Sequence, residues 1–137
     1  MTVKRNGIVE GYARGWPREI FDCKGKFAKQ IGFLKGPGVY VLYNDGDPHY
    51  IGQAISMVKR LGDHAKPQSR YYHLWNTFSA FQVGGPKQSD KLRDELEAIL
   101  IAAMPTANSA KPKLNKMRMP REVVALMKKI RDARIPK

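Results

Sequence analysis

Three polar side chains lie at chemically suggestive positions on two predicted helices. Arg60 and His64 are one helical turn apart, so they stack at the rim between the apolar and polar faces of their helix. Glu97 is the only charged residue in the run 96–104 and lies off the outward face of its helix. A guanidinium can fork onto a phosphate, a carboxylate suits a hard cation such as Mg²⁺, and an imidazole can move a proton near neutral pH. A structural alternative pairs Glu97 with Arg60 or Arg93, because an unpaired buried charge is costly.

Two tyrosines, Tyr40 and Tyr50, lie on the strands of a predicted β-hairpin. The strand residues are rich in β-branched and aromatic types, and the sequence between them has turn chemistry. A three-residue loop over 44–46, with its glycine in the left-handed conformation, pairs Tyr43 with Asp47 and sets Tyr40 directly opposite Tyr50. Both phenols then share one face of the hairpin. A loop of two or four residues would place them on opposite faces, because side chains alternate along a strand.

The rest of the chain predicts one further strand and three helices. In order, these are a helix over 56–66 with Ser56 as N-cap, a strand over 77–83, a helix from Ser89 or Asp90 that ends by Pro105, and a helix from Pro120 or Arg121 onward. The second helix has Ile99 at its apolar spacing and Ala98 on its outward face. We therefore expect an α/β (α+β) fold in which helices flank a small three-stranded antiparallel sheet, with the order β-β-α-β-α and a basic C-terminal helix.

The charge of the chain is concentrated at its two ends. The 137 residues include 25 Lys and Arg against 12 Asp and Glu, a net charge of +13. Residues 1–37 carry +5, residues 38–110 are neutral and residues 111–137 carry +8. We interpret these segments as a basic N-terminal extension, a core and a basic C-terminal helical extension. Such an imbalance predicts a nucleic-acid partner; a basic packing protein of a ribonucleoprotein is the alternative.

The cysteine count and hydropathy narrow the class of protein further. Cys23 is the only cysteine, so no intramolecular disulfide can form. No run approaches the ~20 apolar residues that span a bilayer. We expect no membrane partner and an intracellular location, in the cytoplasm or the nucleoid or nucleus. The aromatic run 71–75 is interpreted as part of the core rather than as a surface for stacking bases.

The ordered residues between positions 38 and 108 resemble the GIY-YIG nuclease family. Five elements carry the resemblance: Gly38-Val39-Tyr40, Tyr50-Ile51-Gly52, Arg60-Leu61-Gly62-Asp63-His64, Glu97 on a helix, and Pro105-Thr106-Ala107-Asn108. The first differs from the family motif by Val in place of Ile. The distance from Glu97 to Pro105 is one residue shorter than in excision-repair relatives, so Asn115 is a second candidate for the asparagine.

The resemblance implies a site made of Tyr40, Tyr50, Arg60, His64, Glu97 and Asn108. Glu97 would hold Mg²⁺ or Mn²⁺, and Arg60 would bind the phosphate. Tyr40 would take the proton of the attacking water, although a phenol with a pKa of ~10 needs help to ionise, and His64 is the alternative base. Tyr50 would orient water or phosphate, and Asn108 would hold a neighbouring side chain or the DNA backbone.

The resemblance therefore implies a Mg²⁺-dependent endonuclease that hydrolyses phosphodiester bonds in DNA, with RNA as an alternative substrate. A restriction, repair or structure-selective role fits better than a homing role, for which a separate DNA-reading region is usual. The alternative function is a catalytically silent nucleic-acid-binding module on the same scaffold. Apart from the resemblance, the charge distribution predicts that the basic segment from Lys111 to Lys137 binds phosphates outside the catalytic face; otherwise the apolar residues of its helix would pack on the core.

Overall fold

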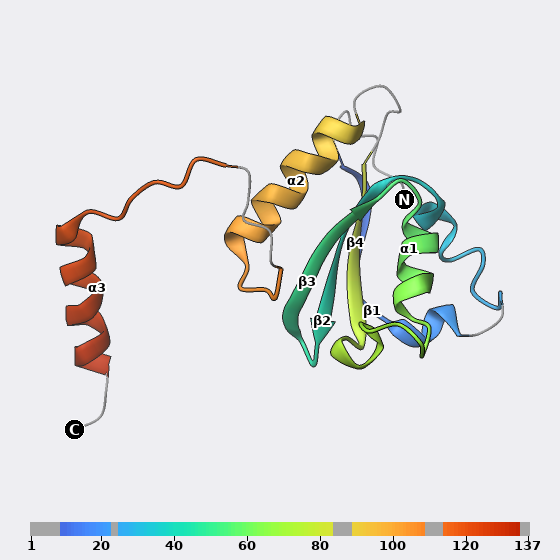
Figure 1. Cartoon of the computed structure of the whole chain (residues 1–137), viewed down its shortest axis with the longest axis horizontal. Helices are drawn as coiled ribbons and strands as arrows, with labels where there is room; N and C mark the ends of the chain where they lie inside the picture. Colours follow the sequence, from blue (N-terminus) through green and yellow to red (C-terminus); the bar gives the residue numbers. More distant parts are fainter. Residues whose placement is uncertain (1–8, 23–24, 84–88, 109–113, 135–137) are drawn as a thin grey trace.

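The computed structural model describes residues 9–22, 25–83, 89–108 and 114–134, and its centre is a four-stranded antiparallel sheet. The strands are β1 (Val9–Pro17), β2 (Gly38–Asn44), β3 (Asp47–Ala54) and β4 (Thr77–Val83), in the spatial order β1-β4-β2-β3 (Figure 1). The three-stranded prediction is wrong by one strand, because β1 comes from the N-terminal segment in which no element is predicted. Its sequence lacks a clean alternation of apolar and polar residues, and its pairing with β4 is irregular in two places.

Each face of the sheet has its own hydrophobic core. Tyr40 and Leu42 point to one face, where α1 (Met57–His64) packs. Val39 and Val41 point to the other, where α2 (Ser89–Ala103) packs (Figure 1). This division follows from the alternation of side chains along β2, which is buried on both faces. Three 3₁₀ turns complete the α1 side: η1 (Arg18–Phe21), η2 (Gly32–Lys35) and η3 (Tyr72–Leu74).

The two strands of the hairpin pair in a register that differs from the predicted one. Asn44 pairs with Asp47, so the turn has two residues, and both Asp45 and Gly46 have positive φ angles of 50° and 88°. These angles are typical of a type I′ turn, which suits the twist of a hairpin. The three-residue loop is therefore wrong. Tyr43 pairs with Pro48 whereas Leu42 pairs with Tyr50, so His49 is an extra, bulged residue of β3. This extra residue returns the side chains that follow it to the predicted faces of the hairpin.

Tyr40 consequently lies opposite Gly52 rather than opposite Tyr50. Leu42 is two residues from Tyr40 and pairs with Tyr50, so the two tyrosines still share one face. Their ring centroids are 6.4 Å apart. The predicted common face is confirmed, but a tight turn followed by a bulge produces it.

The helices begin and end close to the predicted positions, with a difference in which face α2 buries. Ser56 precedes α1 with extended backbone angles, although its side chain makes no capping hydrogen bond. In α2, Ala98 is buried and Ile99 is 53% exposed, the reverse of the predicted assignment. An alanine fits either side of a helical wheel, so the wheel alone does not define the centre of the packed face.

Helix α3 (Arg121–Arg134) lies apart from the sheet at the end of an extended segment (Figure 1). All of its residues are exposed, and its large apolar side chains are 41–54% exposed. The alternative in which α3 packs on the core is therefore wrong. Across the described ranges, no helix is both long and apolar enough to cross a bilayer. Cys23 and residues 111–113 and 135–137 of the C-terminal extension lie outside these ranges, and the predicted segment boundaries stay predictions.

Candidate active site

Two glycines of the hairpin allow its strands to approach their neighbours closely. A Cβ atom on Gly52 would overlap the phenol of Tyr40, which crosses over this position from the opposite strand. A Cβ atom on Gly38 would overlap the carbonyl oxygen of Phe81 and the side chain of Met57. Both positions therefore require glycine for space. The glycines thus position Tyr40, which is 1% exposed.

Tyr40 and His64 form a buried hydrogen-bonded pair. The distance from the Tyr40 hydroxyl oxygen to Nε2 of His64 is 3.0 Å. Burial, followed by the nearby Tyr50 phenol, raises the pKa of Tyr40. Burial, followed by the positive charge of Arg60, lowers the pKa of His64 to about 4. At neutral pH the phenol is therefore protonated and the imidazole is neutral, so the Tyr40 hydroxyl can donate to an unprotonated Nε2.

A third tyrosine, Tyr71, joins this pair and Tyr50. The Tyr71 ring centroid lies 4.6 Å from that of His64 and 5.3 Å from that of Tyr50. Arg70 donates to the Tyr71 hydroxyl at 3.0 Å, and its guanidinium lies 5.0 Å from the Tyr71 ring centroid. The sequence interpretation places the run 71–75 in the core, which holds for the fully buried Trp75 but misses the contact of Tyr71 with the candidate site.

Opposite charges reach the two hairpin tyrosines from two helices. Burial is the main cause that raises the pKa of Tyr40 and of Tyr50. Beyond burial, the charge of Glu97 on α2 raises both values, whereas the charge of Arg60 on α1 lowers both. Glu97 is half-buried, in contrast to the exposed Glu95 on the same helix. The structure thus brings Tyr40, Tyr50, Arg60, His64 and Glu97 into one electrostatically coupled group.

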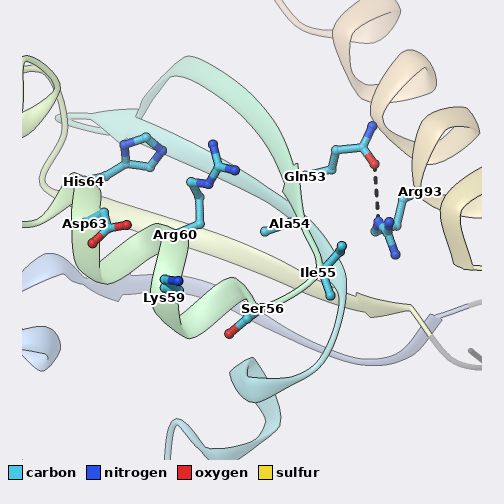
Figure 2. A pocket seen from close by; sticks show the side chains of 9 residues that line it. All are labelled: Gln53, Ala54, Ile55, Ser56, Lys59, Arg60, Asp63, His64 and Arg93. Carbon is cyan, nitrogen blue, oxygen red and sulfur yellow. Dashed lines mark hydrogen bonds between the residues drawn. The ribbon is translucent and has the colours of Figure 1, made fainter.

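An open pocket lies beside this group (Figure 2). Its volume is about 680 Å³. Arg60 and His64 line it from α1, and Arg93 lines it from α2, whereas Glu97 is not among its lining residues. The guanidinium of Arg60 is therefore accessible to a phosphate that enters from solvent.

Asn108 lies outside this group and holds the backbone of β3. Its Oδ1 atom accepts from the Ile51 amide at 2.9 Å, and its Nδ2 atom donates to the Ile51 carbonyl at 2.8 Å. The adjacent Ala107 amide donates to the carbonyl of His49 at 2.7 Å. Asn108 thus contacts a neighbouring backbone, and neither the predicted side-chain contact nor an open DNA-facing position is seen. Asn115, the second candidate, is exposed.

The residues fit a single Mg²⁺ held mainly by water and substrate. Among the described residues, no group of three or more His, Cys, Asp or Glu side chains could hold a metal ion. Mg²⁺ is commonly bound through one or two carboxylates, with waters and phosphate oxygens as its other ligands. Glu97 would be the carboxylate for such an ion, because its charge acts on both hairpin tyrosines. Asp63, the acidic residue at the pocket, pairs with Lys66 at 3.1 Å.

Comparison with known sequences identifies the family. The GIY-YIG catalytic domain matches residues 36–109, which is more than half of the chain. The chain belongs to the GIY-YIG family. GIY-YIG domains form a nuclease family. No curated protein matches the sequence significantly.

Solved structures of one bacterial domain are similar to this chain. The magnesium-bound N-terminal endonuclease domain of UvrC from Thermotoga maritima is 28% identical, and the alignment covers 57% of this chain and 91% of that domain with a TM-score of 0.41. A tyrosine-to-phenylalanine mutant of the same domain, bound to its catalytic divalent cation, is 26% identical over 57% of this chain and 90% of that one, with a TM-score of 0.40.

Proposed function

We propose that this GIY-YIG domain is a metal-dependent endonuclease that hydrolyses phosphodiester bonds in DNA. The observation that supports this most strongly is the buried pair of Tyr40 and His64, which is coupled to Arg60 and Glu97. Hydrolysis needs a group that takes a proton from water and positive charge that stabilises the phosphorane. The Tyr40–His64 pair supplies the proton acceptor, and Arg60 supplies part of the positive charge.

In this proposal Tyr40 and His64 act together as a proton relay. Water gives a proton to the Tyr40 oxygen as the phenol passes its own proton to Nε2 of His64, and the hydroxide attacks phosphorus. The bond from phosphorus to the deoxyribose oxygen breaks, that oxygen takes up a proton from solvent, and His64 then releases its proton to solvent. A relay reconciles the two candidate bases, because neither group need carry charge before substrate binds. Burial, followed by the charge of Arg60, lowers the pKa of His64, and a phosphate bound to Arg60 offsets the second of these causes. Substrate binding therefore makes His64 a better base.

Glu97 would hold the divalent cation, Mg²⁺ or Mn²⁺. When bound, the cation supplies positive charge where the phosphate oxygens become more negative during hydrolysis. The cation would also offset the Glu97 charge, which adds to burial in raising the pKa of Tyr40 and Tyr50. Tyr50 orients water or phosphate, and Tyr71 restricts the rings of Tyr50 and His64.

The proposal is tested by incubating supercoiled plasmid with the full chain in Mg²⁺, in Mn²⁺ and in EDTA. We expect nicked or linear DNA with either metal and none in EDTA. Glu97→Gln removes a metal ligand with little change in volume, so cleavage should be lost while folding and DNA binding persist. Glu95→Gln is the matched control, since Glu95 is exposed on the same helix and should tolerate the change.

Two outcomes would contradict parts of this function. Wild-type turnover by Glu97→Gln would remove Glu97 as the metal ligand. Binding of DNA without cleavage in either metal would favour the catalytically silent module. Parallel incubation with single- and double-stranded RNA of the same sequence determines whether RNA is the preferred substrate.

A further inference from the structure

The pocket beside Arg60 has a second cationic wall, formed by Arg93. The pocket is lined by the positively charged side chains of Lys59, Arg60 and Arg93 and by the one carboxylate of Asp63, which pairs with Lys66. Figure 2 shows Arg60 on α1 and Arg93 on α2 at two sides of this pocket. The proposed hydrolysis uses Arg60 only, so the charge of Arg93 has no role in it.

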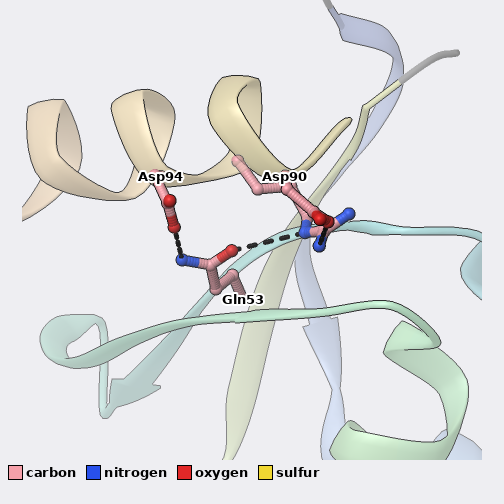
Figure 3. Close-up of polar contacts among 4 residues, drawn as sticks. Gln53, Asp90 and Asp94 are labelled. Carbon is pink, nitrogen blue, oxygen red and sulfur yellow. Dashed lines mark hydrogen bonds and ion pairs between the residues drawn. The ribbon is translucent and has the colours of Figure 1, made fainter. Parts of the chain in front are cut away.

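Arg93 is held in place by two neighbours. Its side chain is 7% exposed, and its Nε atom donates to Oε1 of Gln53 on β3 at 3.3 Å (Figure 2). Gln53 in turn donates from Nε2 to Oδ1 of Asp94 at 2.7 Å, which fixes the amide (Figure 3). Nη2 of Arg93 pairs with Asp90 one turn earlier on α2. The guanidinium is therefore positioned before any ligand arrives.

The ion pair with Asp90 gives little reason for this arrangement. The Asp90 side chain is 87% exposed, so solvent screens its attraction for Arg93. Burying a guanidinium costs free energy that a well-packed apolar side chain at the same position would avoid. A buried cation at the wall of an open pocket is more readily explained by an anionic ligand.

We propose that Arg93 binds a phosphate of the DNA backbone other than the one that is cleaved. The inference rests on the proposed function, in which Arg60 binds the scissile phosphate of the same substrate. A second fixed guanidinium at the other side of the pocket sets the position of the strand without reading its sequence. Arg93 is thus a positioning residue that contacts the substrate away from the reacting atoms.

The proposal and a purely structural ion pair predict opposite effects for one substitution. Asp90 competes with a phosphate for Arg93 and repels it, so Asp90→Asn should strengthen DNA binding. A structural pair instead loses its acidic partner in Asp90→Asn, which should weaken packing of α2 on β3 and leave DNA binding unchanged or weaker. Asparagine is nearly isosteric with aspartate and keeps a polar side chain in the first turn of α2.

The experiment measures binding without cleavage, in EDTA and in a Glu97→Gln background. Fluorescence anisotropy with a labelled duplex is recorded from 50 to 200 mM NaCl. Arg93→Gln should raise Kd by about tenfold, the scale of a lost charge-assisted hydrogen bond, and reduce the slope of log affinity against log salt by about 0.9. Lys91→Gln is the control, because Lys91 is exposed on the same helix and the net charge changes equally. We expect its slope to stay near that of the parent.

The possible results distinguish a phosphate site at Arg93 from a purely structural ion pair. Equal effects of Arg93→Gln and Lys91→Gln, or unchanged or weaker binding by Asp90→Asn, would overturn the phosphate site and leave the proposed nuclease function intact. Failure of the parent to bind DNA would instead overturn DNA as the substrate. Thermal unfolding of every variant is measured alongside. If Arg93→Gln does not fold, the comparison of Asp90→Asn with Glu95→Gln still decides, because Glu95→Gln removes an exposed acidic charge from the same helix. Binding that Asp90→Asn strengthens no more than Glu95→Gln would overturn the phosphate site.

Discussion

At the scale of single residues, the protonation states of Tyr40 and His64 dominate the site. Both groups are held uncharged in the free protein, mainly by burial. An ordinary exposed histidine would be partly protonated below pH 7 and could not accept a proton from Tyr40. Burial therefore keeps His64 available as an acceptor over a wider range of pH, at a cost in its basicity.

The shifted histidine predicts a defined pH dependence of stability. Burial, followed by the charge of Arg60, lowers the pKa of folded His64 to about 4 from its usual 6.5. Between these values the unfolded chain binds a proton that the folded chain does not. The contribution to the free energy of unfolding is therefore full above about pH 6.5 and is lost as the pH falls to about 4.

The measurement is urea unfolding at half-unit steps from pH 4 to pH 7.5. Wild type should lose stability across the acidic part of this range more steeply than His64→Gln, which cannot titrate there. His49→Gln is the control, because the imidazole of His49 is not part of the buried pair. Parallel pH curves for wild type and His64→Gln would refute a neutral, buried His64.

Sequence reasoning selected all five members of the coupled group but missed Tyr71, whose ring contacts those of Tyr50 and His64. Tyr40, Tyr50, Arg60, His64 and Glu97 follow ordered motifs, and position on a helix separates Glu97 from Glu95. Tyr71 comes from a loop, where no periodicity shows which way a ring points. Its neighbour Arg70, which donates to the Tyr71 hydroxyl, was the one available signal, because it places a cation beside an aromatic ring.

At the scale of elements, close packing of the hairpin explains both motif glycines. Gly52→Ala would place a methyl group against the Tyr40 phenol and force it from His64. We expect a loss of about 1–3 kcal/mol in the free energy of unfolding, as for other overpacked sites, and a loss of cleavage. The measurements are urea unfolding and plasmid cleavage.

Gly62→Ala provides the matched control. Gly62 lies within α1, and a Cβ atom there would meet nothing within 4 Å. Alanine should stabilise the helix by up to about 1 kcal/mol. Equal stability of Gly52→Ala and wild type would show that Tyr40 can move aside, which would contradict the close approach.

At the same scale, we expect Asn108 to stabilise the outer edge of β3. Asn108→Ala removes two hydrogen bonds from the Ile51 backbone, between Tyr50 and Gly52. The cost should be about 1–3 kcal/mol, because part-buried backbone groups lose their partners. Urea unfolding checks the cost, and faster hydrogen exchange at the Ile51 amide locates it. Asn115→Ala, at an exposed position, should stay within about 0.5 kcal/mol of wild type.

The order of the elements was predictable from hydrophobic periodicity and turn residues, but the strand register was not. Asn44, Asp45 and Gly46 fit both a two-residue and a three-residue turn, and the bulge at His49 leaves no mark in the sequence pattern. Strand β1 was missed for a related reason. Its pairing with β4 is irregular in two places, and each irregularity changes which face the following side chains point to, so apolar and polar residues do not alternate along it.

At the scale of the whole molecule, five of the ten basic residues of the C-terminal segment lie on α3, an element that does not contribute to the core. Helix α3 carries basic side chains beside exposed apolar ones and lies apart from the sheet (Figure 1). Stability of the nuclease core should therefore not depend on it. This separation makes the contribution of the segment to DNA binding measurable by itself.

The last prediction is that α3 binds DNA phosphates independently of the chemistry. Replacing Lys128, Lys129, Arg131 and Arg134 by Gln removes four cations and keeps the apolar side chains of the helix. If each neutralises one phosphate, the slope of log affinity against log salt should flatten by roughly 3.6. The cleavage rate at saturating protein should persist, and the melting temperature should stay unchanged because α3 does not pack on the core. An unchanged slope would show that α3 is not a DNA-binding arm, whereas a fall in melting temperature would show that it stabilises the core after all.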